Sequence, residues 1–493
     1  LQCFARIKNR GLDCRASVGR LFAIAAGAIF TRRITVVAKS KSFAGHIGTT
    51  VGESTPSWQP PAKPPPGAPN IVVIVLDDTG FAQLGCFGAP IDTPNIDRLA
   101  ESGLRYTNFH VTPLCSPTRA SLLTGRNHHA VGMGCLADFN TGYPSGSGAI
   151  SHSAATIAEM LKPHGYVSYA VGKWHLTPSF SISAVGPFDQ WPLGRGFDHY
   201  YGFLWGESDQ YRPQLWRDNH HAETPLRPDY HVSEDFVDEA IRNISDHITA
   251  GSTNPFLMYL AFGAMHAPHQ APQEYIDKYH GRFDVGWDEV RADVLRRQID
   301  MGVVPEGTTL PSANDDVRPW NELTADEQRL YAKMQEAFAG FMDHTDEQIG
   351  RLLDFLEREQ LSENTLIVLM SDNGASGEGG PAGSVNEYRY FLQQPDSFED
   401  NLAAIDVIGS PATHNHYPTG WAQAGNTPNK LYKKFTHAGG VRAPMVISWP
   451  STVKSPGVRD EFRHVTDIVP TLLAAVGVDA PTVMKGTGQL PVH

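Results

Sequence analysis

A cysteine at the start of a short helical pattern is the first feature of this sequence that could carry chemistry. Cys115 is followed by Ser, Pro117, Thr and Arg119, and then by the run Ala-Ser-Leu-Leu-Thr-Gly. Pro117 suits the first turn of a helix, and Gly125 is typical of a residue that ends one. Backbone N–H groups at a helix N-terminus favour an anion, which Arg119 could also reach. The pattern indicates a nucleophile beside an anion pocket, as an oxyanion ester requires; the alternative is a small free cysteine packed under a helix.

Carboxylate and amide side chains follow two apolar runs at the same relative place. Asp77 and Asp78 follow one run, and Asp372 and Asn373 follow another after a single serine. If both runs are strands of one parallel sheet, these oxygens emerge at the same edge. Three carboxylates together repel one another unless a cation offsets them, and Ca²⁺ accepts irregular oxygen sets more readily than Mg²⁺. The doubled pattern predicts a calcium site, although Asp77 and Asp78 could instead cap the next element.

The elements that must position these residues alternate along the chain. Apolar, β-branched runs predict buried strands at Ile71–Leu76, Tyr166–Val171, Phe256–Phe262, Leu366–Met370 and Met445–Trp449. Helical patterns lie between and after them, at Thr93–Ser102, Thr156–Leu161, Ala325–Glu357 and Val465–Val476. The pattern over Ala325–Glu357 leaves open whether this helix is continuous or broken. Strands alternating with helices predict an α/β fold with a large, mostly parallel sheet and helices on both faces.

Composition limits the classes of partner. The chain has 493 residues, 19% of them charged, and a net charge of −13, so we expect no nucleic-acid partner, which would need a basic face. Five scattered cysteines provide neither a disulfide framework nor a Cys-x-x-Cys zinc pattern. The apolar run Leu21–Phe30 is too short to span a bilayer. It could belong to a signal peptide, but no clear cleavage site follows it, so a cytoplasmic location is favoured over secretion.

The sequence predicts three parts. Residues 1–53 form an N-terminal extension that is signal-like or disordered, and residues 54–69 form a proline-rich linker. Residues 70–493 form the catalytic domain. Within it, residues 375–430 are rich in Gly, Pro, Ser and Asn and predict a long excursion on the substrate side.

Several motifs, taken in order, resemble the type I, formylglycine-dependent sulfatases, and most of all the bacterial arylsulfatases. The resemblance extends from about Pro69 to Val478, and its fold is alkaline-phosphatase-like. We also expect the smaller C-terminal subdomain of that family to be truncated here. The matching segments are Asn70 to Asp78 with Gly80, Cys115-x-Pro117-x-Arg119, Gly172-Lys173-Trp174-His175, His266-Ala267-Pro268-His269, Ser371-Asp372-Asn373-Gly374, and Lys433 before Gly439-Gly440.

The resemblance implies a nucleophile and two proton carriers. In the family a maturation enzyme, a transient partner, oxidises the cysteine to formylglycine, and the aldehyde becomes hydrated. Hydrated formylglycine 115, activated at the metal and by Asp372, would attack the sulfur of a small-molecule sulfate ester. His266, which occupies the family position, would protonate the leaving alcohol. His269 is the alternative for this role, or else supports the site from behind His266. His175 would take a proton as the sulfated hemiacetal collapses.

The resemblance also implies how charge is handled at the site. The groups that would stabilise the sulfate oxygens are Arg119, Lys173 and Lys433. The groups that would hold one Ca²⁺ are Asp77, Asp78, Asp372, Asn373 and residue 115.

Two other functions compete with a sulfatase. The first is a phosphonate or phosphate ester hydrolase of the same superfamily, since some of these share Cys-x-Pro-x-Arg. The second is a non-catalytic binding protein on the same fold, which the complete set of expected residues disfavours. Within the sulfatase interpretation, aryl, alkyl and sugar sulfates all remain open as substrates, as does the oligomeric state.

Overall fold

The computed structural model describes residues 43–492 except 59, 226 and 395. The chain divides into two compact units, residues 1–59 and residues 60–493. The division falls within the predicted linker, and the apolar run Leu21–Phe30 lies outside the described residues. In the described part of the first unit, a 3-10 turn, Val51–Glu53, lies near a bridge between His46 and Thr55.

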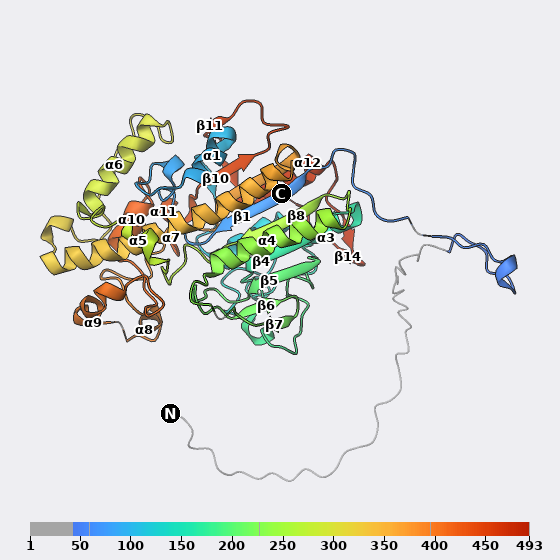
Figure 1. Cartoon of the computed structure of the whole chain (residues 1–493), viewed down its shortest axis with the longest axis horizontal. Helices are drawn as coiled ribbons and strands as arrows, with labels where there is room; N and C mark the ends of the chain where they lie inside the picture. The colour runs from blue at the N-terminus through green and yellow to red at the C-terminus, as the bar shows by residue number, and fades with distance from the viewer. Residues whose placement is uncertain (1–42, 59, 226, 395, 493) are drawn as a thin grey trace, which may run out of the picture. The chain divides into compact units, whose positions relative to one another are not determined.

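A ten-stranded sheet organises the described part of the second unit (Figure 1). In spatial order, its strands are β11 (Gly457–Arg459), β2 (Leu104–Tyr106), β10 (Met445–Ser448), β9 (Thr365–Ser371), β1 (Asn70–Leu76), β8 (Phe256–Ala261), β4 (Val167–Lys173), β5 (His199–Phe203), β6 (Leu215–Arg217) and β7 (His220–Ala222). The central strands β9, β1, β8, β4 and β5 are all parallel. Two small pairs accompany it, β3 (Phe109–His110) with β12 (Arg463–His464), and β13 (Val483–Met484) with β14 (Thr487–Gly488).

Strand β1 explains why helices cover both faces of this sheet. Its side chains alternate between two buried clusters, and every residue from Ile71 to Leu76 is buried. The even-numbered residues pack with α1 (Pro94–Ser102), α4 (Val232–Thr249) and α7 (Ala325–Arg358). The odd-numbered residues pack with α2 (Cys115–Thr124), α3 (Ile157–Leu161) and α12 (Ile468–Val476). A strand that is apolar on both faces therefore requires two helical layers, as the sequence predicted.

In Figure 1, α4 and α7 lie in front of the sheet, and the remaining helices lie around the two layers. They are α5 (Gln273–Asp277), α6 (Gly286–Asp300), α8 (Glu387–Phe391), α9 (Phe398–Ala403), α10 (Thr419–Gly425) and α11 (Ala438–Val441). Helix α7 is continuous over 34 residues and begins with a capping box between Thr324 and Glu327. The break that the sequence left open in this helix is absent from the structure.

Toward both edges of the sheet, strands run antiparallel to their neighbours, which the sequence pattern did not predict. Strand β10 runs antiparallel to β9, and β6 and β7 form an antiparallel extension beyond β5. Residues 375–430 contain the short helices α8, α9 and α10, although their sequence shows little periodicity. Such short elements depend on tertiary packing, which a local pattern does not report.

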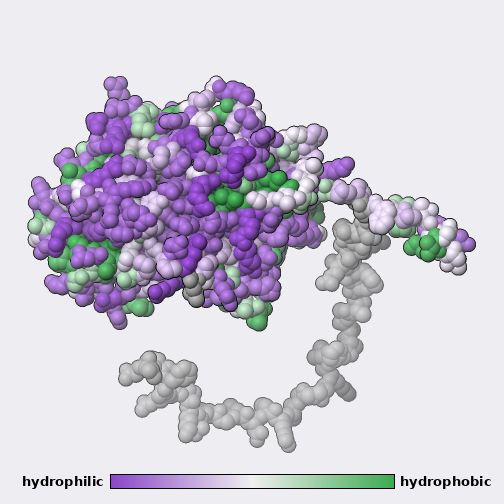
Figure 2. All heavy atoms as spheres, in the orientation of Figure 1, coloured by the Kyte–Doolittle hydropathy of each residue, from purple (hydrophilic) through white to green (hydrophobic). Residues whose placement is uncertain are grey.

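The described residues include no helix that is both long and apolar enough to cross a membrane. Figure 2 shows one face of the molecule, which is mostly hydrophilic with small, separated hydrophobic patches.

Candidate active site

The two predicted sets of acidic side chains meet at the carboxyl edge of the sheet. Strands β1 and β9 are parallel neighbours with Leu76 opposite Ser371, so the residues that follow each strand lie side by side. The Asp78 backbone N–H donates to Asp372 Oδ1 at 3.3 Å, and Asn373 Nδ2 donates to Asp78 Oδ1 at 2.7 Å. These side chains are fully buried, or nearly so.

This acidic cluster fits a hard divalent cation. Asp77, Cys115 and Asp372 each offer a ligand atom, and these atoms lie within 4.8 Å of one another. Asp77 Oδ1 and Asn373 Oδ1 are buried without a hydrogen-bond partner in the described structure. Burial, together with the nearby Asp77, raises the pKa of Asp372 to about 6. A bound cation would satisfy the free oxygens and reduce the repulsion between the carboxylates.

Two buried lysines already offset part of this negative charge. Lys173, the last residue of β4, forms an ion pair with Asp77. Lys433 Nζ lies 2.9 Å from Asp78 Oδ2 and 2.6 Å from a carboxylate oxygen of Glu378. Burial alone would lower the pKa of Lys173, but Asp77 holds it above its usual value, so this lysine is a cation at neutral pH. The site thus brings together carboxylates, which are suited to a metal, and ammonium groups, which are suited to an anion.

Arg119 is directed differently from the sequence expectation. It was expected to face the substrate anion, but its guanidinium contacts the acidic cluster, with both Nε and Nη2 at 2.8 Å from Asp372 Oδ2. Its Nη1 donates to the Lys173 carbonyl at 2.9 Å, and its side chain is fully buried. Arg119 therefore orients Asp372 and the end of β4 in this structure.

Cys115 begins helix α2 and faces His175. The distance from Cys115 Sγ to His175 Nδ1 is 3.2 Å, and the Ser116 hydroxyl donates to the His175 carbonyl at 2.8 Å. Burial raises the pKa of the Cys115 thiol to about 12. The unmodified thiol is therefore protonated at neutral pH and is a poor nucleophile.

The direction of His175 is not set by the alternation of side chains along β4. His175 lies two residues beyond the end of this strand, with a φ of 52° in the left-handed region. Its Nε2 lies 2.9 Å from Asp138 Oδ2. Sequence analysis did not find Asp138, which lies in an irregular segment after α2 and belongs to no recognised motif.

The structure separates the two candidate histidines after β8. His266 lines the cavity, with Nε2 3.1 Å from Lys433 Nζ and Nδ1 2.8 Å from the Ala267 carbonyl. Burial, aided by Lys433, lowers the pKa of His266 to about 3, so its ring is neutral at pH 7. His269 is buried against Phe338 and does not line this cavity.

These groups lie at a cavity of about 650 Å³. The predicted residues that line it are Cys115, His175, His266 and Lys433. The lining also includes acidic and aromatic groups that sequence analysis missed, namely Asp138, Phe139, Trp205, Glu207, Asp209, Glu378 and Tyr388. Two of these come from the predicted substrate-side excursion, whereas the others come from loops that only the fold brings together.

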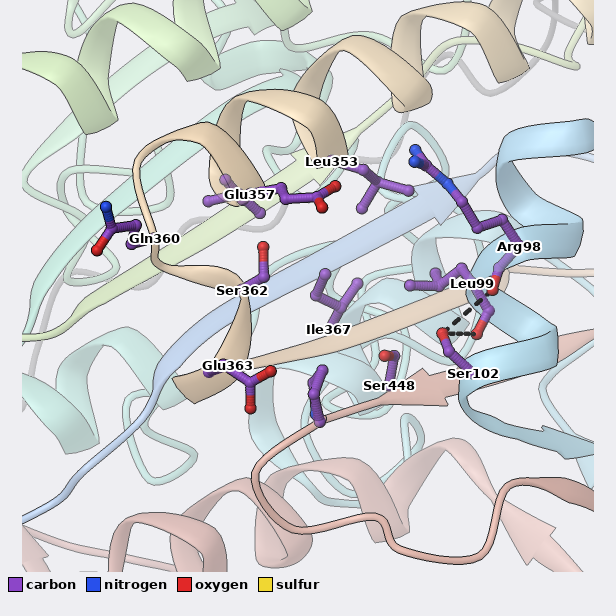
Figure 3. Close-up of a pocket in the computed structure, with 12 residues that line it drawn as sticks. Arg98, Leu99, Ser102, Leu353, Glu357, Gln360, Ser362, Glu363, Ile367 and Ser448 are labelled. Carbon is purple, nitrogen blue, oxygen red and sulfur yellow. Dashed lines mark hydrogen bonds between the residues drawn. The ribbon is translucent and has the colours of Figure 1, made fainter.

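A second cavity, of about 410 Å³, lies away from this chemistry (Figure 3). Arg98 and Ser102 of α1 line one side, and Leu353 and Glu357 of α7 line another. It also contacts Ile367, early in β9, so it lies toward the amino end of that strand, and no candidate site residue lines it.

Comparisons with known proteins identify the family of this chain. The sequence model of the family described as Sulfatase matches residues 69–478. The chain is 34% identical over 441 residues to an uncharacterized sulfatase of Schizosaccharomyces pombe, covering 84% of this chain and 76% of the relative. It is 30% identical over 440 residues to the arylsulfatase of Klebsiella aerogenes, covering 86% of this chain and 90% of the relative. The chain therefore belongs to the sulfatase family and is a sulfuric ester hydrolase.

Solved structures show the same fold. The structure of Ps i-CgsB is similar with a TM-score of 0.57 and 25% identity, covering 86% of this chain and 75% of that one. The PsFucS1 sulfatase from Pseudoalteromonas sp. is similar with a TM-score of 0.52 and 21% identity, covering 83% and 68%. The predicted alkaline-phosphatase-like architecture, with a large, mostly parallel sheet, is confirmed.

Proposed function

We propose that this chain hydrolyses sulfate monoesters through a formylglycine made from Cys115, with Ca²⁺ held by residue 115 and by the acidic cluster Asp77, Asp78, Asp372 and Asn373. One observation carries the proposal. Residue 115 lines the cavity and contacts both the acidic cluster and His175, with the buried Lys173 and Lys433 near it. The similarity to the Klebsiella arylsulfatase makes an aryl sulfate the first substrate to test.

The two added groups would each supply what the side chains lack. Hydrated formylglycine supplies an oxygen nucleophile for sulfur and a second hydroxyl whose proton can be removed to release sulfate. Ca²⁺ supplies positive charge that offsets the carboxylates and polarises the ester.

The protein's own groups would handle charge and protons. Lys173 and Lys433 stabilise the negative charge that spreads over the sulfate oxygens in the transition state. With Asp138 on Nε2, His175 presents Nδ1 to residue 115 as a proton acceptor. As the bond from sulfur to the ester oxygen breaks, the Lys433–His266 pair supplies the proton that the leaving alcohol takes. Arg119 acts as a positioning residue through Asp372.

The first experiment is the mass of one tryptic peptide. The full chain is expressed in a host that contains the formylglycine-generating maturation enzyme, which is the proposed transient partner. Trypsin releases Tyr106–Arg119, in which Cys115 is the single cysteine. The mass of the aldehyde supports the proposal, whereas an intact thiol, in a host that matures a control sulfatase, contradicts the proposed nucleophile.

A substrate comparison then separates the sulfatase from its superfamily rival. The matured enzyme is assayed on an aryl sulfate and on a phosphonate monoester with the same aryl group. We expect the higher kcat/KM on the sulfate. A higher value on the phosphonate would assign the chain to the rival reaction while leaving the nucleophile unchanged.

A further inference from the structure

One group of possible metal ligands lies beside the cavity and includes no residue of the acidic cluster at the sheet edge. Glu207, Glu387 and His414 each offer one ligand atom, and these atoms lie within 4.8 Å of one another. Glu207 follows β5, Glu387 begins α8, and His414 lies between α9 and α10. No part of the proposed reaction uses them.

Backbone pairing holds two of these residues in place. The Glu387 N–H donates to the His414 carbonyl at 3.0 Å, and the His414 N–H donates to the Val385 carbonyl at 2.9 Å. The ring of Tyr388 stacks on that of His414 with centroids 4.2 Å apart. These contacts therefore hold the backbones of Glu387 and His414 next to each other.

Glu387 provides an independent indication that something is bound here. Its side chain is buried with 0% exposure, and neither carboxylate oxygen accepts a hydrogen bond from the described residues. His414 Nε2 is also without a partner there. A buried polar group left unsatisfied costs about 1–3 kcal/mol, and more when it is charged. Among the ion pairs of the described residues, none involves Glu387, and Glu207 pairs with His266, at 3.8 Å from its Nδ1, but with no lysine or arginine.

We propose that Glu207, Glu387 and His414 bind a divalent transition-metal ion of the Zn²⁺ type in the wall of the cavity. Two carboxylates with one imidazole suit such an ion, whereas Ca²⁺ and Mg²⁺ select sites made of oxygen alone. The ion would supply the positive charge that offsets these two carboxylates. It would also fasten α8 to the loop after β5, which together contribute Tyr388 and Glu207 to the cavity lining.

Burial and the nearby Glu207 raise the pKa of Glu387 well above its usual range, which identifies the competing explanation. A proton on Glu387 would also remove the repulsion between the carboxylates. If Glu387 is protonated, the site holds no metal ion. A count of the metal ions bound per chain therefore distinguishes protonation from metal binding.

The test is a metal count on the full chain. The protein is stripped with a chelator, refilled with excess Ca²⁺ so that the all-oxygen site stays occupied, and titrated with Zn²⁺. Bound metal is measured by calorimetry and by elemental analysis after gel filtration. We expect one Zn²⁺ per wild-type chain and none in Glu387→Gln or His414→Gln. Controls at exposed positions, Glu399→Gln and His220→Gln, should keep the ion.

Three results would overturn the proposal. They are a wild-type chain that binds no Zn²⁺, cluster variants that still bind it, and an ion bound elsewhere. If the variants fail to fold, anomalous diffraction at the zinc edge on wild-type crystals decides, because the peak must lie among Glu207, Glu387 and His414. None of these measurements needs turnover, so the result stands or fails independently of the proposed sulfatase mechanism.

Discussion

His175 is contacted at both of its ring nitrogens, by residue 115 at 3.2 Å and by Asp138 at 2.9 Å. A carboxylate on Nε2 keeps the proton there and leaves Nδ1 free to accept one. Burial lowers the pKa of His175, so the ring is neutral and able to act as a base near pH 7. Asp138 thus sets the orientation and tautomer of His175, the proposed catalytic base.

Replacing Asp138 with asparagine should therefore impair chemistry more than folding. The amide can donate to Nε2 and favour the opposite tautomer, so we expect kcat on an aryl sulfate to fall by about 10²–10⁴-fold. The mass of the Tyr106–Arg119 peptide shows whether maturation is intact. The matched control is Asp189→Asn, at a half-exposed position. An unchanged kcat in a matured Asp138→Asn enzyme would contradict the role of Asp138.

Replacing Cys115 with serine or alanine should abolish turnover while leaving the fold intact. Serine lacks the second hydroxyl through which the proposed mechanism releases sulfate, and alanine lacks any nucleophile. Both changes reduce or preserve side-chain volume, so we expect a thermal midpoint near that of the wild type. Cys135→Ser, at a half-buried position, is the control. Near-full activity in either Cys115 variant would exclude the formylglycine mechanism.

At the level of residues, the sequence located the candidate groups that belong to motifs and missed those that support them. Asp77, Asp372 and Lys173 could be found because they lie at the carboxyl ends of recognisable strands. Asp138 and Glu378 come from irregular segments, and their contacts with His175 and Lys433 exist only in the folded chain. Such a contact cannot be predicted from hydrophobic periodicity or from the spacing of residues within a motif.

At the level of elements, the same distinction separates strong from weak signals. Strand β1 is apolar from Ile71 to Leu76, and α7 carries a capping box and a long amphipathic repeat. Both were predicted with nearly correct bounds. The direction of β10 and the antiparallel pair β6–β7 were not predicted, because a short strand gives no local sign of its neighbour. Helix α8, with five residues, depends on its surroundings for stability.

The N-terminus of α3 offers a prediction about stability and pH. Glu159 accepts from the Thr156 N–H at 3.0 Å, and its carboxylate lies 3.2 Å from Arg195 Nη2 and 3.0 Å from Lys485 Nζ. Burial alone would raise the pKa of Glu159, but Arg195 and the other partners hold it below 4.5. Burial lowers the pKa of Arg195, and Glu159 opposes that shift. The ionised pair thus stabilises the fold above about pH 4.5, and this contribution is lost as the pH falls through the folded-state pKa.

Replacing Glu159 with glutamine should lower the free energy of unfolding at pH 7 by about 3 kcal/mol, because Arg195 would remain buried without its partner. The loss should shrink as the pH falls below the folded-state pKa, where Glu159 in the wild type is itself neutral. Urea unfolding at several pH values measures both effects. Glu101→Gln, at an exposed position of α1, is the control. A variant that is equally destabilised at every pH would show that packing, and not charge, is lost.

At the scale of the whole molecule, the sheet gathers side chains that are hundreds of residues apart. Asp77 and Asp372 meet because β1 and β9 are parallel neighbours, and Lys173 joins them from the end of β4, two strands away. Residue 115 arrives from the other direction, on a helix packed against the odd-numbered face of β1. The site therefore forms only when the strands assemble into the sheet, and its buried carboxylates lie where the central strands of the domain end.

Removing the proposed Ca²⁺ should consequently lower both activity and stability. At about a hundred times its Kd, a ligand stabilises a folded chain by about 2.7 kcal/mol, which chelation would remove. Lys173 and Lys433 still neutralise Asp77 and Asp78 in the metal-free chain, so the thermal midpoint should fall without loss of the fold. Added Ca²⁺ should restore turnover of an aryl sulfate, and Mg²⁺ should do so less well, because the irregular oxygen set suits the larger ion. Full activity after chelation would contradict the calcium site, whereas a lower midpoint with unchanged activity would give the ion a structural role alone.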